Sequence, residues 1–344
     1  MAQAYDANVT TDGGGEPRRG SGAAGRLRRW IGKFRDGMWR RGIITAVLAV
    51  LTALVMGFHG ALPNRIGNVG SLTETFLPWV GLAIPVLLVI ALLRRSATAL
   101  IALLVPVLVW ANFFGGLLSD KHTGGGDLTV LTHNVNADNP DPAGTARDLI
   151  ASGADVIALE EIAVGQAPSY EHGLKAAYPY HSVQGTVGLW SKYPLTGVRP
   201  VDIGLGWVRA MRAAITTPDG KAAVYVAHLP SVRVKFNAGF TAGERDHSAD
   251  DLGEAIAGEK MPDVILMGDL NGTMNDRALA NITSQMRSTQ GAAGHGFGFS
   301  WPADFPMARI DQILVRGAEP TDSWVLPATD SDHRPVAAKV ALSQ

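Results

Sequence analysis

Two short segments near the C-terminus carry side chains suited to acid–base chemistry. One reads Gly-Asp-Leu-Asn at residues 268–271, and the other reads Ser-Asp-His at residues 331–333. A carboxylate and an amide two residues apart can orient water and a phosphoryl oxygen, and a histidine held by a carboxylate can donate or accept a proton. The two segments together carry residue types that a metal-dependent phosphoesterase needs.

Other acid, amide and imidazole side chains stand at the ends of segments that read as β-strands. A rigid scaffold can aim such side chains into a shared cleft, so we expect them to gather with the two motifs. Carboxylates such as Glu161 and Asp332 are hard oxygen ligands that suit Mg²⁺ or Mn²⁺. The remaining candidates are Asn134, Glu160, His228 and Asp311.

The elements that must position these residues lie between Asp127 and the C-terminus. Two stretches there, 142–152 and 248–257, read as helices, and shorter apolar stretches read as strands. The strands are expected at 128–135, 156–159, 187–190, 213–216, 222–227, 264–267, 310–315 and 336–341. This mixture of strands and helices predicts one α+β domain.

The first third of the chain is built differently. Residues 42–58, 76–93 and 97–118 carry no charged side chain. A helix needs about 20 mostly apolar residues to cross a bilayer core, so the three segments predict three transmembrane helices. Helices of a soluble bundle would show a polar face, which none of the three has. A cleaved signal peptide is disfavoured because no small-residue cleavage site follows the first segment and two more apolar segments do.

Basic residues near the predicted spans indicate their orientation. Nine Lys and Arg residues precede the first span, whereas the loop after it holds only Arg65. Because Lys and Arg are retained in the cytoplasm, we expect the N-terminus inside and the catalytic domain outside a multi-pass cell-membrane protein. The absence of cysteine agrees with a domain that does not rely on disulfides and suits the cytosol equally. The predicted parts are a disordered basic tail (1–41), a membrane domain (42–118), a linker (119–126) and an extracytoplasmic domain (127–344).

The soluble part resembles the endonuclease/exonuclease/phosphatase superfamily, whose fold is a four-layer αββα sandwich. Besides the two motifs, the resemblance rests on Asn134, on Glu161 and on three short segments. These segments are Gly-Leu-Trp-Ser-Lys-Tyr-Pro-Leu at 188–195, Ala-His-Leu at 227–229 and Arg-Ile-Asp at 309–311. Several of the signals occur in family order. The resemblance implies a Mg²⁺-dependent hydrolase, with Mn²⁺ as the alternative ion, that acts on phosphoric ester or anhydride bonds.

The resemblance implies a metal site. Glu161 would be the principal ligand, with Asn134 close to the metal and the phosphate. Asp332 would be a further ligand or an electrostatic partner. The family commonly has Gln before the metal-binding Glu, and this chain has Glu160 there, so which of the two glutamates binds the metal stays open.

The resemblance also implies the catalytic roles. Asp269 would position or activate water, and Asn271 and His228 would contact the phosphate. His333 would lie at the scissile phosphate, oriented by Asp311.

Charge and tethering bear on the substrate. From Ser119 onward, 18 Lys and Arg residues stand against 26 Asp and Glu, a formal net charge of −8 without a basic run. Nucleic-acid-binding proteins usually present a basic stripe, so nucleic acid is a disfavoured partner. Membrane spans would hold the domain at the bilayer, which favours a lipid-linked phosphate. Arg209 and Arg212 are candidates for gripping a diphosphate, although both also fit a strand surface.

Nearly the whole chain, including residues 62–79, resembles actinobacterial VanJ-type membrane proteins linked to teicoplanin resistance. This resemblance implies hydrolysis of undecaprenyl diphosphate, a prenyl-linked carrier of cell-wall synthesis, with lipid II as a related substrate. We expect the loop 60–75 and the apolar segment 297–305 to admit the prenyl chain, with Trp301 contacting it. Ordinary packing is the alternative for Trp301.

Two other classes of function stay open. An extracellular nuclease or a lipid phosphodiesterase would use the same residue types on a different ester. A protein that only binds a cell-wall precursor or a glycopeptide would not require a water-activating Asp269. Metal-dependent release of inorganic phosphate from a prenyl diphosphate distinguishes a prenyl-diphosphate phosphatase from both of these classes.

Overall fold

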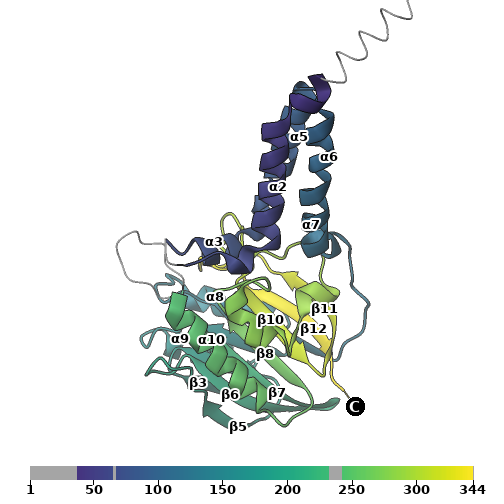
Figure 1. Cartoon of the computed structure of the whole chain (residues 1–344). Coiled ribbons are helices and arrows are strands. Elements are labelled where there is room, and N and C mark those ends of the chain that lie inside the picture. Colours follow the sequence, from purple (N-terminus) through teal and green to yellow (C-terminus); the bar gives the residue numbers. More distant parts are fainter. Residues whose placement is uncertain (1–36, 65–66, 232–241, 344) are drawn as a thin grey trace, which may run out of the picture.

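The computed structural model describes residues 37–64, 67–231 and 242–343, which form two connected parts (Figure 1). Apolar helices form one part, and a sandwich of two β-sheets forms the other. The expected basic tail lies outside the described residues as far as residue 36.

The helical part contains a bundle in which α2 packs against α5, α6 and α7 (Figure 1). Its helices are α2 (Ile43–Gly57), α3 (Val69–Thr75), α4 (Leu77–Val80), α5 (Ala83–Leu93), α6 (Ala97–Ala102) and α7 (Leu104–Phe114), with 3₁₀ turns η1 (His59–Ala61) and η2 (Gly115–Leu118). The bundle points away from the sandwich, while α3 lies where the two parts meet.

One helix of the described chain, Ala97–Leu118, is long and apolar enough to cross a membrane. A second span is present if α3 and the helix Leu77–Leu93, which are bent by 85°, count as one. The helix α2 is apolar but has only 15 residues. One such helix is weak support for membrane association, and three spans and their orientation stay predictions.

The sandwich contains two six-stranded sheets. The first has the order β11-β12-β1-β2-β4-β3, and the second has the order β5-β6-β7-β8-β10-β9. The first comprises β1 (Leu128–Asn134), β2 (Val156–Glu160), β3 (Tyr180–Gln184), β4 (Val187–Ser191), β11 (Glu319–Val325) and β12 (Val336–Ala341). The second comprises β5 (Leu195–Pro200), β6 (Ala210–Thr217), β7 (Gly220–His228), β8 (Val264–Asp269), β9 (Arg287–Ser288) and β10 (Asp311–Arg316). All eight expected strands are present, and the mixed α+β class is confirmed.

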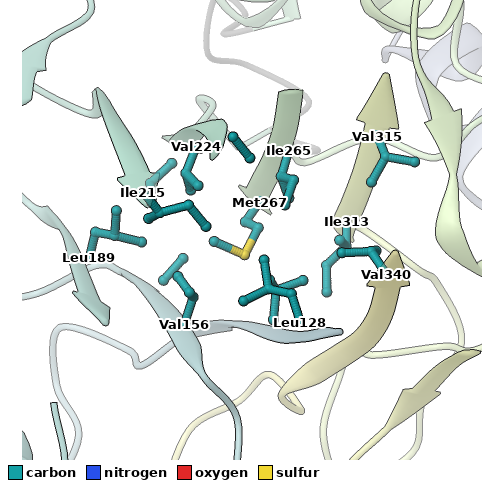
Figure 2. Close-up of a cluster of buried hydrophobic side chains, with 14 of the residues drawn as sticks. Leu128, Val156, Leu189, Ile215, Val224, Ile265, Met267, Ile313, Val315 and Val340 are labelled. Atoms are coloured by element: carbon teal, nitrogen blue, oxygen red, sulfur yellow. The ribbon is translucent and has the colours of Figure 1, made fainter. Parts of the chain in front are cut away.

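The main core lies between the sheets because alternate residues of the strands point inward. Val156, Ile265 and Ile313 are among these fully buried side chains (Figure 2). The residues one position along the strands face outward and are covered by helices, which completes four layers. The helices that accompany the sandwich are α8 (Pro142–Ala151), α9 (Ala167–Leu174), α10 (Ala242–Ala257), α11 (Ala280–Thr283) and α12 (Thr289–Ala293), with the turn η3 (Arg277–Leu279).

The register of the strands brings their polar ends to one edge of the sandwich. In the parallel pair β1 and β2, Asn134 stands opposite Glu160. In the parallel pair β7 and β8, His228 stands opposite Asp269, and Asp311 of β10 stands opposite Asp269 from the other side. Residues far apart in the sequence therefore meet because parallel strands end at the same edge.

The helical part is attached to the sandwich near this edge. The indole N–H of Trp79 donates to the carbonyl of Met307 (2.7 Å), and Arg277 Nη1 donates to the carbonyls of Gly60 (2.7 Å) and Leu62 (2.6 Å). These contacts join positions more than 200 residues apart and hold the segment from η1 to α4 against the domain.

Candidate active site

A cavity of about 350 Å³, here called the cleft, opens where the polar strand ends meet. Leu72, Thr75 and Phe76 of the helical part contribute to its wall. Seven of the residues expected at the site also line it: Asn134, Glu161, Asp269, Asn271, Trp301, Asp332 and His333. The structure thus brings the two motifs together and adds a wall from the apolar part of the chain.

Asp269, at the end of β8, is oriented by three hydrogen bonds. The side-chain amide of Asn134 donates to its Oδ2 (3.0 Å), and the backbone and side-chain N–H groups of Asn271 donate to its Oδ1 (2.9 Å) and Oδ2 (3.2 Å). Burial raises the pKa of Asp269 above its ordinary value, while His333 opposes the shift. An oriented carboxylate with a raised pKa is suited to accept a proton from water.

His333 and Asp311 form a buried ion pair beside Asp269. His333 Nδ1 lies 2.9 Å from Asp311 Oδ2, to which Ser300 Oγ also donates (2.6 Å). Burial lowers the pKa of His333, but Asp311 and Asp269 raise it more, to about 10, so the imidazole is protonated at neutral pH. Its Nε2 lies 3.9 Å from Asp269 Oδ2. Asp311 thereby fixes the imidazole with one nitrogen and leaves the other toward Asp269.

The neighbouring glutamates occupy different environments. Glu160 has no exposed surface and accepts a hydrogen bond from Thr132 Oγ1 (2.9 Å), and burial raises its pKa well above the ordinary value. Glu161 has a φ of +59°, which turns the chain out of β2, and its side chain is 36% exposed and lines the cleft. A metal ion binds an ionised, accessible carboxylate, so the geometry favours Glu161 as the ligand.

His228 and Arg209 lie behind the residues that line the cleft. His228 Nε2 is 3.6 Å from both Glu161 Oε1 and Asp269 Oδ2, and burial, with Arg209 nearby, lowers the pKa of His228 well below its ordinary value. The imidazole is therefore neutral. The guanidinium of Arg209 lies over the ring of Trp207, 5.1 Å from its centre, and the carbonyl of Arg209 accepts the N–H of His228 (2.9 Å).

Arg212 does not reach the cleft, contrary to the expectation that it grips the substrate. Its Nε donates to Glu259 Oε2 (2.9 Å) on the outer face of the second sheet. Arg209 and Arg212 are three residues apart along extended chain, so their side chains leave opposite faces. Arg212 is a structural ion-pair residue in this fold.

Trp301 and Asp332 border the cleft from the C-terminal half of the domain. The ring of Trp301 lies 6.5 Å from that of His333, and Asp332 is exposed. The backbone N–H of Ala303 donates to the carbonyl of Asp332 (2.7 Å), and the N–H of Arg334 donates to the carbonyl of Ser300 (2.8 Å). These bonds attach the aromatic segment to the Ser-Asp-His motif.

The donor atoms around the cleft fit a divalent cation. Glu161, Asp269 and Asp332 place three carboxylates on one cavity, and hard oxygen ligands of this kind suit Mg²⁺. Asp269, Asp311 and His333 also offer ligand atoms within 4.8 Å of one another. Hydrogen bonds between His333 and Asp311 already engage two of the three, so the accessible Glu161 and Asp332 are the better ligands.

The family comparison agrees with this geometry. The profile of the Endonuclease/Exonuclease/phosphatase family matches residues 131–333, more than half of the chain. The chain belongs to this family. Family members hydrolyse phosphodiester and phosphate bonds, so the expected superfamily and the expected class of hydrolase are confirmed at that level.

Several solved structures share the fold of this family member. A functionally unknown conserved protein from Enterococcus faecalis V583 is 15% identical, with a TM-score of 0.54, and the match covers 63% of this chain and 100% of that one. Beta toxin from Staphylococcus aureus and a mannosyl-6-phosphatase from Bacteroides thetaiotaomicron are each 16% identical, with TM-scores of 0.51, and their matches cover 62% of this chain and 99% of theirs. These likenesses concern the fold alone. A comparison with curated proteins found no match.

Three kinds of contributor to the site were not predicted from the sequence. Ser300 supports Asp311, and only its position next to Trp301 hints at a polar role. Leu72 and Phe76 line the cleft; Leu72 falls in the loop 60–75 that was expected to admit the prenyl chain, whereas Phe76 was assigned to the second predicted span. Arg245 Nη1 donates to the carbonyl of Asn271 (2.9 Å), and no motif marks it.

Proposed function

We propose that this protein is a membrane-anchored, extracytoplasmic phosphohydrolase that releases inorganic phosphate from undecaprenyl diphosphate with the help of Mg²⁺. Lipid II is the related substrate, and the activity would contribute to glycopeptide resistance of the teicoplanin type by acting on the lipid carrier. The multi-pass topology, with the N-terminus in the cytoplasm, belongs to this proposal.

One observation carries the proposal: the cleft has two chemically different walls. Asp269 and His333 supply acid–base groups, and Leu72 and Phe76 of the segment joined to the apolar bundle supply an apolar wall. The bundle itself exposes large apolar side chains, including Ile44 (75%) and Leu93 (79%). Exposed apolar surface of this kind is typical of contact with lipid. A phosphate group attached to a lipid chain matches both walls.

The chain's own residues support the following hydrolysis. Asp269, fixed by Asn134 and Asn271, takes a proton from water as the water oxygen bonds to the terminal phosphorus. The bond from that phosphorus to the bridging oxygen breaks, and the lipid monophosphate leaves with the bonding electron pair. The protonated His333, held by Asp311, stabilises the negative charge that develops on the phosphoryl oxygens.

A bound Mg²⁺ would neutralise part of the charge on the diphosphate and help to position it. Glu161 and Asp332 would hold this ion, with Asn134 nearby. His228 would support Glu161 and Asp269 from behind, and Arg209 would add positive charge next to His228.

Phosphate release from undecaprenyl diphosphate by the detergent-solubilised full chain tests the proposal. We expect release with Mg²⁺ and its loss in EDTA, in Glu161→Ala and in His333→Ala. Cleavage of DNA or of a lipid phosphodiester without phosphate release from the diphosphate would replace the substrate. Precursor binding with no turnover of any phosphate ester would assign the protein to the binding class.

A further inference from the structure

A second cavity of about 280 Å³ lies next to the cleft, where the helical part meets the sandwich. Phe113 and Phe114 of α7 contribute to it, as do Phe297 and Phe299 of the aromatic segment. Thr75 lines both cavities, so they are neighbours. The cleft carries the catalytic carboxylates, and the second cavity reaches Phe113 and Phe114 at the end of α7.

Aromatic contacts build the apolar wall of this second cavity. The rings of Phe297 and Phe299 stack 5.0 Å apart, and Trp79 stacks on Phe299 at 5.7 Å. Phe297 also lies 6.0 Å from Phe114. The wall therefore consists of rings from both the helical part and the sandwich, next to the end of α7.

A buried arginine makes this cavity different from an ordinary apolar gap. Arg309 is 6% exposed and lines the cavity, and its Nη1 donates to the carbonyl of Gly298 (3.0 Å). Its Nε and Nη2 have no hydrogen-bond partner within the described residues. Among the described residues that line the cavity, Arg309 is the one with a charge. Leaving guanidinium donors buried and unpaired is costly, and a bidentate anion removes that cost.

We propose that the second cavity binds the lipid monophosphate half of a prenyl diphosphate. Arg309 pairs with the phosphate that stays on the lipid, and Phe297 and Phe299 contact the first prenyl units. The terminal phosphoryl group then lies in the cleft, past Thr75. This inference rests on the proposed function and assigns an orientation to its substrate: after hydrolysis, the second cavity holds the lipid monophosphate and the cleft holds inorganic phosphate.

The chemistry of the cavity decides against simpler occupants. A neutral alcohol would offer no anionic acceptor to Nε and Nη2 of Arg309, and inorganic phosphate would leave the aromatic wall empty. A prenyl monophosphate satisfies both, and Arg309 is favoured over Lys for such a role because its planar fork matches two phosphate oxygens.

Binding of farnesyl phosphate to the detergent-solubilised full chain tests the proposal by calorimetry, with farnesol and inorganic phosphate as the two half-ligands. We expect farnesyl phosphate to bind at least tenfold more tightly than either half. Arg309→Gln should weaken that binding at least tenfold, and Phe299→Ala should weaken it too. The matched control is Arg316→Gln, because Arg316 ends β10, the strand that follows Arg309, and donates to the carbonyl of Ile256, away from both cavities.

The outcomes separate this inference from the proposed function. Hydrolysis of undecaprenyl diphosphate, together with equal binding of farnesyl phosphate to wild type, Arg309→Gln and Phe299→Ala, would overturn the second cavity and keep the function. Arg309-dependent binding without hydrolysis would keep the cavity and overturn the function. If Arg309→Gln does not fold, Phe299→Ala decides alone. Equal competition by phosphatidylglycerol in the same micelles would reassign the cavity to a bilayer lipid and overturn the prenyl assignment.

Discussion

Two groups of buried charges lie close together in this protein and have different surroundings. The cleft group, Asp269, Asp311 and His333, lies at the edge of a cavity, and His333 Nε2 stands 3.9 Å from Asp269, too far for a hydrogen bond. The second group lies where the helical part meets the sandwich and is here called the joint group. It consists of Arg245 and Asp276, which are paired through two hydrogen bonds of 2.7 and 3.2 Å. Buried charges that satisfy one another fix geometry, whereas those that leave polar atoms facing a cavity are available for chemistry.

The joint group also connects the helical part to the cleft. Arg245 donates to Ser71 Oγ on α3 (3.3 Å) and to the carbonyl of Asn271 (2.9 Å), the residue that orients Asp269. Thr273 Oγ1 donates to the carbonyl of Glu74 on the same helix (3.2 Å). The site is therefore positioned partly by contacts with the apolar part of the chain.

The largest effect should come from the cleft group. Asp269→Asn keeps the shape of the side chain but removes the proton acceptor, so we expect the rate of phosphate release to fall about 10³-fold. The change also turns one accepting oxygen into a donor that faces an N–H group of Asn134 or Asn271, so the melting temperature is measured beside the rate and rates are compared between folded samples. A rate within tenfold of wild type would assign water activation to another residue and break the contrast between the two groups.

The joint group should respond in the opposite way. Asp276→Ala leaves the guanidinium of Arg245 buried without its carboxylate, and breaking such a pair costs about 3–5 kcal/mol of unfolding free energy. Chemical denaturation of the solubilised protein measures the loss. Unchanged stability would mean that Asp246, which also pairs with Arg245 (3.0 Å), is sufficient to hold it.

The contrast between buried and accessible carboxylates can be sharpened at the two glutamates. Glu161→Gln should weaken the apparent affinity for Mg²⁺ at least about tenfold, since even outer partners of metal ligands are worth about 10- to 100-fold. Glu160→Gln should leave it within about threefold, because Glu160 has no exposed surface and burial raises its pKa, which disfavours the charged form that a metal ion binds. Mg²⁺ titration of phosphate release compares the two. A larger effect for Glu160→Gln would exchange their roles.

The smallest effect is expected at Arg212, outside both groups. Burial raises the pKa of Glu259. This effect is outweighed by Arg212, the N–H of Met261 and the hydroxyl of Tyr225, which together lower the pKa to about 2. The pair therefore stabilises the fold above pH 4.5, and this contribution is lost as the pH falls from 4.5 toward 2. Arg212→Ala should remove about 1–2 kcal/mol at pH 7 and flatten the acid limb of the stability profile, with unchanged catalysis. A loss of activity at unchanged stability would return Arg212 to substrate binding.

Most of the long strands of the sandwich could be predicted from local patterns. The strands that were identified are short runs of β-branched and aliphatic residues with one face buried, and this signal is present within a few residues. The missed strands β3, β5, β9 and β11 are half-exposed, very short or interrupted by Pro, so their apolar alternation is weak. The motif residues were identified because their types and their order along the chain resemble the motifs of the family. They stand at strand ends, where the backbone register brings them together.

The sequence by itself determined which residue types are available for the chemistry, the alternation that forms the two sheets and the apolar runs of the first third. Only the tertiary structure decided which of Arg209 and Arg212 approaches the cleft, which glutamate is accessible, and that Arg309 is buried beside aromatic rings. The reason is that these properties depend on contacts between distant positions, such as Ser71 with Arg245 or Trp79 with Met307. Local propensities carry no information about which distant residue will supply a partner or a cavity wall.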